Sequence, residues 1–120
     1  MFRRKPKFVS PQSYKKASKE KRKQICNGCG PKGYDWFVPD HLLGINITEC
    51  CNIHDWMYKH GTTESDRCWA DALFLINMRI AIRFPKHTWK QLQTCRLGLA
   101  IFYYNMARQY GEGAFNNLVK

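Results

Sequence analysis

The chain has 120 residues, of which 44% are hydrophobic and 14% aromatic, and a formal net charge of +11. This length suits one domain with a modest core. No apolar run reaches the length of a membrane span, and no hydrophobic signal segment follows the basic start. The composition predicts a single small domain without a membrane-spanning helix.

Most of the charge lies in residues 1–24, which contain ten Lys or Arg against one acid, Glu20. They carry +9 of the net charge and leave +2 for the remainder. Two prolines and few apolar residues are typical of a flexible basic arm, which can be helical from Tyr14 to Gln24. We predict a basic flexible arm, 1–24, and a folded domain, 25–120. The arm is either a solubilising tail or a surface that attracts anionic membranes or nucleic acid, with lipid preferred.

The next stretch, residues 25–46, is rich in loop-forming residues. Tight turns are favoured in the run Cys26-Asn27-Gly28-Cys29-Gly30-Pro31-Lys32-Gly33. Exposed backbone carbonyls in such a loop are hard oxygen ligands that suit Ca²⁺. An ordinary Gly-Pro turn held by a disulfide explains the same residues. The apolar residues that follow are expected to form a wall near a site or plain core: Tyr34, Trp36, Phe37, Val38, Leu42 and Leu43.

A helix is predicted from Thr48, as N-cap, to His60, before Gly61. The positions i, i+3, i+4 and i+7 on one face of this helix are Cys51, His54, Asp55 and Tyr58. A face that only packs would carry Leu, Ile or Val, and burying a carboxylate beside a histidine is costly unless it is paired. The pattern indicates a catalytic or metal site.

A second helix is predicted from the capping sequence Thr63-Glu64-Ser65-Asp66 to about Ile82, before Pro85. In an antiparallel hairpin, His54 would lie about 9 Å and Asp71 about 12 Å from the turn, so their side chains can meet. Asp66 is the alternative partner for His54, but its position at the start of the helix already gives it a structural role as a capping residue. A further helix is predicted from Thr88 to Tyr110, closed by Gly111.

Together these segments resemble a known family. The segment Cys-Cys-x-x-His-Asp-x-x-Tyr, from Cys50 to Tyr58, resembles the active-site helix of secreted phospholipases A2, and Asn27-Gly28-Cys29-Gly30 resembles their calcium loop. The likeness is to the atypical group XII branch and to bacterial and viral relatives, and it covers roughly Cys26 to Met78. It implies an all-α, disulfide-supported domain with an antiparallel pair of long helices carrying the active site, a calcium-binding loop and a further C-terminal helix.

The resemblance also implies an activity, the calcium-dependent hydrolysis of the sn-2 ester of glycerophospholipids. In this family's mechanism His54 would be the general base on water, and Asp71 would orient it. Tyr58 would hydrogen-bond the aspartate. No serine or cysteine nucleophile is needed, and the sequence contains no Gly-x-Ser-x-Gly.

A Ca²⁺ cofactor is implied in the same way, held by the Asp55 carboxylate and the carbonyls of Gly28, Gly30 and Lys32. In the family, the second of the paired cysteines ties the helix to the calcium loop, which implies a pair of Cys51 with Cys29. Four cysteines could then pair in several ways: Cys26, Cys50, Cys68 and Cys95. The full family pattern cannot be carried over, because Met57 stands where most members have a cysteine.

We expect a monomer that works at a phospholipid surface, preferably anionic, and that is secreted or acts at a membrane surface. No signal peptide is visible, so a cytoplasmic or virion-associated protein is the alternative. A competing hypothesis is a zinc-binding module that contacts nucleic acid through the basic arm, with Cys26, Cys29, Cys50, Cys51 and His54 as components. Adjacent cysteines point to different sides of a helix, and zinc leaves Asp55, Tyr58 and Asp71 unexplained. A third hypothesis is an inactive, phospholipase-like lipid-binding protein.

Overall fold

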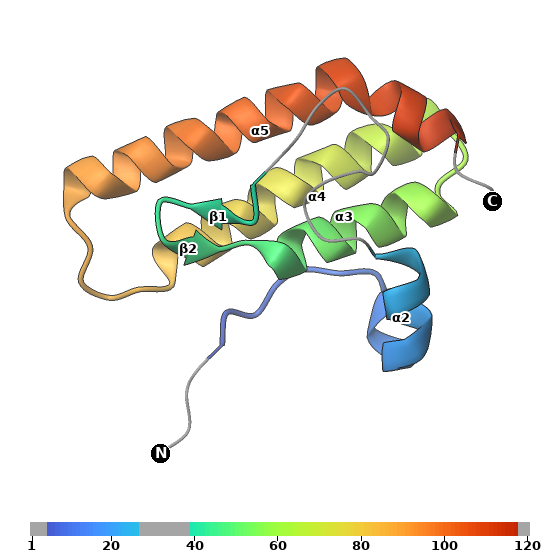
Figure 1. Cartoon of the computed structure of the whole chain (residues 1–120), viewed down its shortest axis with the longest axis horizontal. Coiled ribbons are helices and arrows are strands. Elements are labelled where there is room, and N and C mark those ends of the chain that lie inside the picture. The colour runs from blue at the N-terminus through green and yellow to red at the C-terminus, as the bar shows by residue number, and fades with distance from the viewer. Residues whose placement is uncertain (1–4, 27–38, 118–120) are drawn as a thin grey trace.

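The computed structural model describes residues 5–26 and 39–117. Within these ranges the order of elements is α1 (Gln12–Lys16), α2 (Lys19–Ile25), β1 (His41–Leu42), β2 (Ile45–Asn46), α3 (Thr48–His60), α4 (Glu64–Arg83) and α5 (Lys90–Asn117). The long helices α3, α4 and α5 lie side by side, and the β1–β2 hairpin contacts α4 and α5 at one end (Figure 1). The prediction of a mainly helical fold is confirmed.

The α3–α4 hairpin turns over at Gly61 to Thr63. The capping box predicted there is complete: the Asp66 N–H donates to Thr63 Oγ1 at 3.0 Å, and the Thr63 N–H donates to Asp66 Oδ2 at 3.1 Å. Helix α3 has the predicted bounds, but its N-cap is Ile47 and not Thr48. The side-chain oxygen of Asn46 accepts a hydrogen bond from the Thr48 N–H at 2.8 Å, so a residue outside the helix satisfies its first turn.

Helix α5 continues through Gly111 to Asn117, so the predicted end at Tyr110 is wrong. A Cβ atom placed on Gly111 would lie 2.5 Å from the hydroxyl oxygen of Tyr58. Glycine is therefore needed here because α5 passes close to α3, and not because the helix stops. The same residue type serves both purposes, and the sequence pattern does not separate them.

The hairpin β1–β2 turns at Leu43 and Gly44, whose φ angles are +43° and +93°. Positive φ at both central positions is the geometry of the type I′ hairpin turn. Leu42 is fully buried in the core with Phe74 and Met78, whereas Leu43 is 50% exposed. Of the predicted wall residues, Leu42 is therefore core and Leu43 is surface. The others, Tyr34, Trp36, Phe37 and Val38, lie outside the described residues.

Residues 5–26 differ from the flexible arm that the charge pattern predicts. Fully buried Asn77 in α4 fixes the main chain of this segment: its Oδ1 accepts from the Val9 N–H at 2.8 Å, and its Nδ2 donates to the Val9 carbonyl at 2.9 Å. The indole N–H of Trp56 donates to Ser13 Oγ at 3.0 Å. These contacts dock the segment on α3 and α4.

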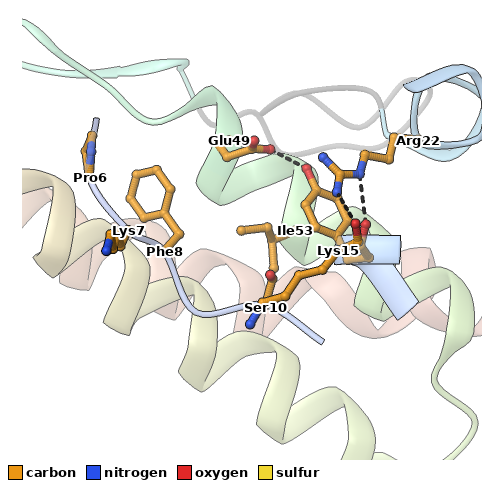
Figure 2. Close-up of a pocket in the computed structure, with 9 residues that line it drawn as sticks. Pro6, Lys7, Phe8, Ser10, Lys15, Arg22, Glu49 and Ile53 are labelled. Atoms are coloured by element: carbon orange, nitrogen blue, oxygen red, sulfur yellow. Dashed lines mark hydrogen bonds between the residues drawn. The ribbon is translucent and has the colours of Figure 1, made fainter. Parts of the chain in front are cut away.

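Two short helices replace the single helix allowed by the sequence, since Ser18 caps α2 by accepting from the Lys21 N–H. Tyr14 of α1 is buried beside Trp56, and its hydroxyl donates to Glu49. Between the segment and α3 lies an open hollow of about 440 Å³, lined by Phe8, Arg22 and Ile53 among others (Figure 2). The lysines of this segment are exposed, and a few apolar residues attach it to α3 and α4. Because lysines outnumber these apolar residues, the composition did not predict the attachment.

Candidate active site

His54 and Asp71 meet across the α3–α4 hairpin. Nε2 of His54 lies 2.6 Å from Oδ1 of Asp71, so the contact predicted from their distances to the turn is confirmed. The histidine is 6% exposed and the aspartate is completely buried. The imidazole lies between the rings of Tyr58 and Phe74, at centroid distances of 4.2 and 4.8 Å, and this packing fixes its orientation.

The partner of Nε2 determines where the His54 proton lies. An ionised carboxylate can only accept hydrogen bonds, so the neutral ring carries its proton on Nε2 and donates it to Asp71. Nδ1 is then left with a free lone pair. Within residues 5–26 and 39–117, Nδ1 has no hydrogen-bond partner. The site thus presents one basic nitrogen that can receive a proton.

The Asp71 carboxylate has four donors around its two oxygens. Oδ1 accepts from the Tyr58 hydroxyl at 2.7 Å as well as from His54. Oδ2 accepts from Nη1 of Arg108 in α5 at 2.8 Å and, more weakly, from Nη1 of Arg67 at 3.5 Å. A carboxylate offers about four lone-pair positions, so this buried group is fully satisfied.

Burial alone would raise the pKa of the Asp71 carboxyl. The hydrogen bonds and charge of His54, with the hydrogen bonds of Tyr58 and Arg108, outweigh this effect and lower the pKa below its usual value. Burial raises the pKa of Tyr58, and the negative charge of Asp71 raises it further. Asp71 therefore stays ionised, and Tyr58 stays a hydrogen-bond donor.

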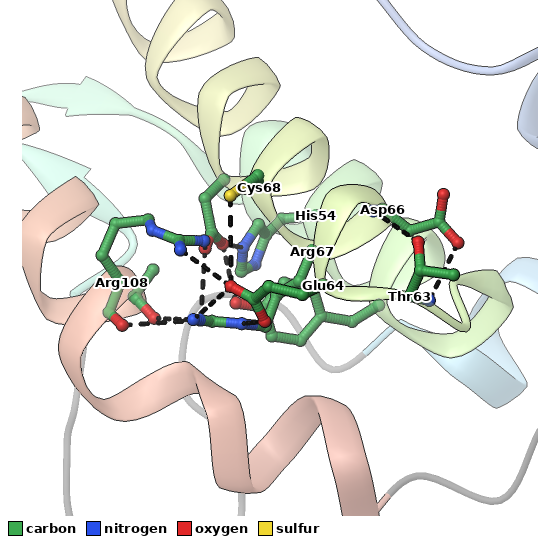
Figure 3. A network of polar contacts seen from close by, with 10 residues as sticks. His54, Thr63, Glu64, Asp66, Arg67, Cys68 and Arg108 are labelled. Carbon is green, nitrogen blue, oxygen red and sulfur yellow. Dashed lines mark hydrogen bonds and ion pairs between the residues drawn. The ribbon is translucent and has the colours of Figure 1, made fainter.

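Glu64 connects the two arginines at the edge of the site (Figure 3). Arg67 donates to it from Nε at 2.9 Å and from Nη2 at 3.0 Å, and Arg108 donates from Nη2 at 2.9 Å. The hydrogen bonds from Arg67, followed by those from Arg108, lower the pKa of Glu64 to about 2. Two carboxylates and two guanidinium groups thus form a neutral network beside the imidazole.

The predicted metal ligands lie mostly outside the described part of the chain. Gly28, Gly30 and Lys32 belong to residues 27–38. Asp55 is described and partly exposed on α3, and its negative charge helps burial raise the pKa of the Cys26 thiol to about 12. A carboxylate is a hard oxygen donor of the kind that Ca²⁺ prefers. Among the described residues alone, no group of three or more His, Cys, Asp or Glu could hold a metal ion.

The described cysteines divide into one oxidised residue and four thiols. Cys51 takes part in a disulfide, and its implied partner Cys29 lies outside the described residues. The thiols are Cys26, Cys50, Cys68 and Cys95. Pairing among these four, which the sequence left open, is not formed, since Cys50 is enclosed in the core while Cys68 and Cys95 are exposed on different helices.

Sequence reasoning missed the two arginines of the site. The spacing of Glu64, Arg67 and Asp71 at i, i+3 and i+7 on one helix was a usable signal for Arg67. Arg108 lies 37 residues from Asp71 and has no local signal. Its position depends on how α5 packs, and only the fold reveals it.

No helix in the described ranges is long and apolar enough to cross a membrane. No protein-family model matches the chain, and comparison with curated proteins and with solved structures found no match.

Proposed function

We propose that the protein is a calcium-dependent phospholipase A2 that hydrolyses the sn-2 ester of glycerophospholipids at a membrane surface, as a monomer. The observation that supports this proposal best is the buried pair of His54 and Asp71, which leaves Nδ1 of the histidine free to accept a proton. The segment from Cys50 to Tyr58 resembles the active-site helix of secreted phospholipases A2, and this resemblance suggests which reaction the pair catalyses. Secretion, or action at a membrane surface, belongs to the same proposal.

In this reaction Nδ1 of His54 removes a proton from a water molecule, whose oxygen attacks the ester carbonyl carbon. The imidazolium that forms is stabilised by Asp71, which already accepts a hydrogen bond from its Nε2–H and also accepts hydrogen bonds from Tyr58 and Arg108. The imidazolium then gives the Nδ1 proton to the departing glycerol oxygen as the carbon–oxygen bond breaks. The products are a free fatty acid and a lysophospholipid.

When bound, Ca²⁺ would polarise the ester carbonyl and stabilise the negative charge on its oxygen. The Asp55 carboxylate and the carbonyls of Gly28, Gly30 and Lys32 would hold it. The partial exposure of Asp55 supports this assignment, since the carboxylate can reach a ligand without disturbing the core. A disulfide between Cys51 and Cys29 would tie this loop to α3, and it completes the proposed disulfide-supported, calcium-binding fold.

The test measures fatty acid release from anionic phospholipid vesicles with millimolar Ca²⁺ and with chelator. We expect calcium-dependent release, and a loss of about 10²- to 10⁴-fold in His54→Gln because the general base is removed. Asp66→Asn is the matched control, since Asp66 caps α4 and makes no contact with Asp71 among its hydrogen bonds. Release that persists in chelator, or that survives in His54→Gln, would refute the assignment.

A zinc-binding nucleic-acid module and an inactive lipid-binding protein are the other candidates. The described geometry favours the module less, because His54 Nε2 is bound to Asp71 and Cys50 is enclosed in the core. No specific observation favours an inactive protein. A folded sample that binds vesicles but releases no fatty acid would instead support an inactive lipid-binding protein.

A further inference from the structure

One end of the molecule exposes large apolar side chains from two separate segments. Trp89, directly before α5, is 81% exposed, and Phe84, the C-cap residue of α4, is 40% exposed. Leu43, at the turn of the β1–β2 hairpin, is 50% exposed. Exposed tryptophan at this level needs an explanation, because burying such a side chain is strongly favourable wherever the fold offers space.

The β1–β2 hairpin and the α4–α5 connection lie next to each other. Arg96 of α5 donates from Nε at 3.1 Å and from Nη2 at 2.8 Å to the carbonyl of Leu43, which ties the hairpin turn to the start of α5. An open hollow of about 410 Å³ is lined by Ile45 of the hairpin together with Pro85, Trp89 and other residues of the α4–α5 connection. We call the surface formed by Leu43, Phe84, Trp89, Lys86 and Lys90 the tip surface.

The charge of the chain from Arg79 in α4 to Arg108 in α5 has one sign. The sequence contains no Asp or Glu between Asp71 and Glu112. The same interval contains six basic residues: Arg79, Arg83, Lys86, Lys90, Arg96 and Arg108. Arg83 and Lys90 directly flank Phe84 and Trp89 in the chain, and Lys86 lies between these two aromatic residues. Exposed apolar side chains are thus bordered by cations without a neighbouring acid in this interval.

We propose that the tip surface is a docking surface that inserts Trp89 and Phe84 into the headgroup region of an anionic phospholipid bilayer. Tryptophan favours this region because its ring is apolar and its N–H can hydrogen-bond. Cations next to the inserted side chains meet lipid phosphates, and each contributes about a fivefold gain in binding to an acidic membrane. Aliphatic Leu43 and Pro85 fit hydrocarbon, whereas they offer nothing to the phosphate backbone of nucleic acid.

This binding mode does not use His54 or Asp71, so it can hold whether or not the protein is a phospholipase. It also differs from attraction by the basic residues of the N-terminal segment, because it requires aromatic side chains at a defined place. The experiment therefore uses the full chain with the His54→Gln substitution, which keeps the vesicles intact during the measurement.

The test is sedimentation with phosphatidylcholine vesicles that contain or lack phosphatidylglycerol. We expect Trp89→Ala to weaken binding to the anionic vesicles about tenfold, the size of effect expected when one large apolar side chain no longer leaves water. Trp69→Ala is the matched control, since Trp69 is also exposed, at 56%, but lies in α4 about 21 Å along the helix from Arg83. It should bind like the parent.

Two further readouts separate insertion from simple charge attraction. Lys86→Gln with Lys90→Gln should weaken binding to anionic vesicles about 25-fold at low salt. Lipids with brominated acyl chains should quench tryptophan emission in the parent, and much less in Trp89→Phe. Because Trp89 is mostly exposed, the variants should unfold at the parent's temperature, which a thermal scan checks.

The proposal is overturned if Trp89→Ala and Trp69→Ala bind the vesicles equally well, because the tip surface then takes no part. It is also overturned if Trp89→Ala abolishes self-association or binding to a DNA duplex while vesicle binding is unchanged. Lost self-association would assign the surface to contact with a second copy of the chain. Lost DNA binding would assign it to nucleic acid.

Discussion

Gly111 in α5 lies directly against the hydroxyl group of Tyr58 in α3, where an added Cβ atom would be 2.5 Å from the hydroxyl oxygen. That hydroxyl donates at 2.7 Å to Oδ1 of Asp71, the same oxygen that accepts the hydrogen bond from Nε2 of His54. The closeness of two helices thus determines whether the carboxylate keeps its full set of donors.

Gly111→Ala should destabilise the protein by about 1–3 kcal/mol, because the methyl group forces the buried tyrosine off Asp71. Gly113→Ala is the matched control, since nothing lies within 4 Å of its added Cβ and alanine should stabilise the helix by about 0.5–1 kcal/mol. Urea unfolding measures both. Tyr58→Phe in the Gly111→Ala background should recover part of the loss, and equal stability of the two alanine variants would contradict the close contact.

The lowered pKa of Asp71 predicts how stability depends on pH. Since its folded pKa lies below the unfolded value, its stabilising contribution is complete above about pH 4 and is lost as pH falls through the folded pKa. Asp71→Asn should remove this part of the acid sensitivity and cost about 3–5 kcal/mol at pH 7, because it breaks a buried ion pair. Denaturant unfolding between pH 7 and pH 3 tests it. A variant that loses stability below pH 4 as steeply as the wild type would show that another group is responsible.

Arg108→Gln should lower kcat of the proposed hydrolysis about 10- to 100-fold and leave KM unchanged, because Arg108 holds Asp71 and the reacting group remains in place. Arg108→Lys should recover little of this, since a lysine cannot bridge Asp71 and Glu64 with a planar fork. Arg79→Gln, an exposed arginine on α4, is the control. An increase in KM without a change in kcat would instead place Arg108 in substrate binding.

The thiols should react in two classes. Cys68 and Cys95 are exposed, so a maleimide should label them within minutes in the native protein. Burial raises the pKa of Cys26 and of Cys50 to about 12, and the charges of Asp55 and Glu49 add to the effect at Cys26. These two should be labelled only after unfolding. Peptide mapping by mass spectrometry identifies each site, and rapid labelling of Cys50 would mean that the core opens.

Asn77→Ala should cost about 1–3 kcal/mol, because it removes both hydrogen bonds to the Val9 main chain. Trypsin should then cleave after Lys15 and Lys16 much faster, as the N-terminal segment detaches. Asn105→Ala, on the exposed side of α5, is the control for a lost asparagine. Unchanged proteolysis in Asn77→Ala would mean that Tyr14 and Trp56 hold the segment without the Asn77 hydrogen bonds.

The α3–α4 hairpin could be predicted because its signals are local. Thr63 and Asp66 form a capping box that predicts the start of a helix. Counting 1.5 Å per residue from the turn was then enough to predict that His54 contacts Asp71. Helical periodicity then placed Tyr58 one turn beyond His54, on the same face.

Contacts between distant segments could not be predicted in this way. Arg108 reaches Asp71 only because α5 packs against α4, and the sequence around Arg108 carries no trace of that contact. Likewise Asn77 is one polar residue within an apolar stripe of α4, and the sequence pattern of that helix does not predict its hydrogen bond with Val9. The lysines of residues 5–26 conceal a short series of anchoring side chains, so an average over the segment misled the prediction.

The hydrogen bonds between Val9 and Asn77 join residues 68 positions apart. During synthesis at about 5–20 residues per second, Val9 is made roughly 3–14 s before Asn77 exists. For that time the Val9 main chain lacks the Asn77 side chain that holds it in the folded protein. Val9 is therefore synthesised well before α4, but it can reach its folded position only after Asn77 has been made.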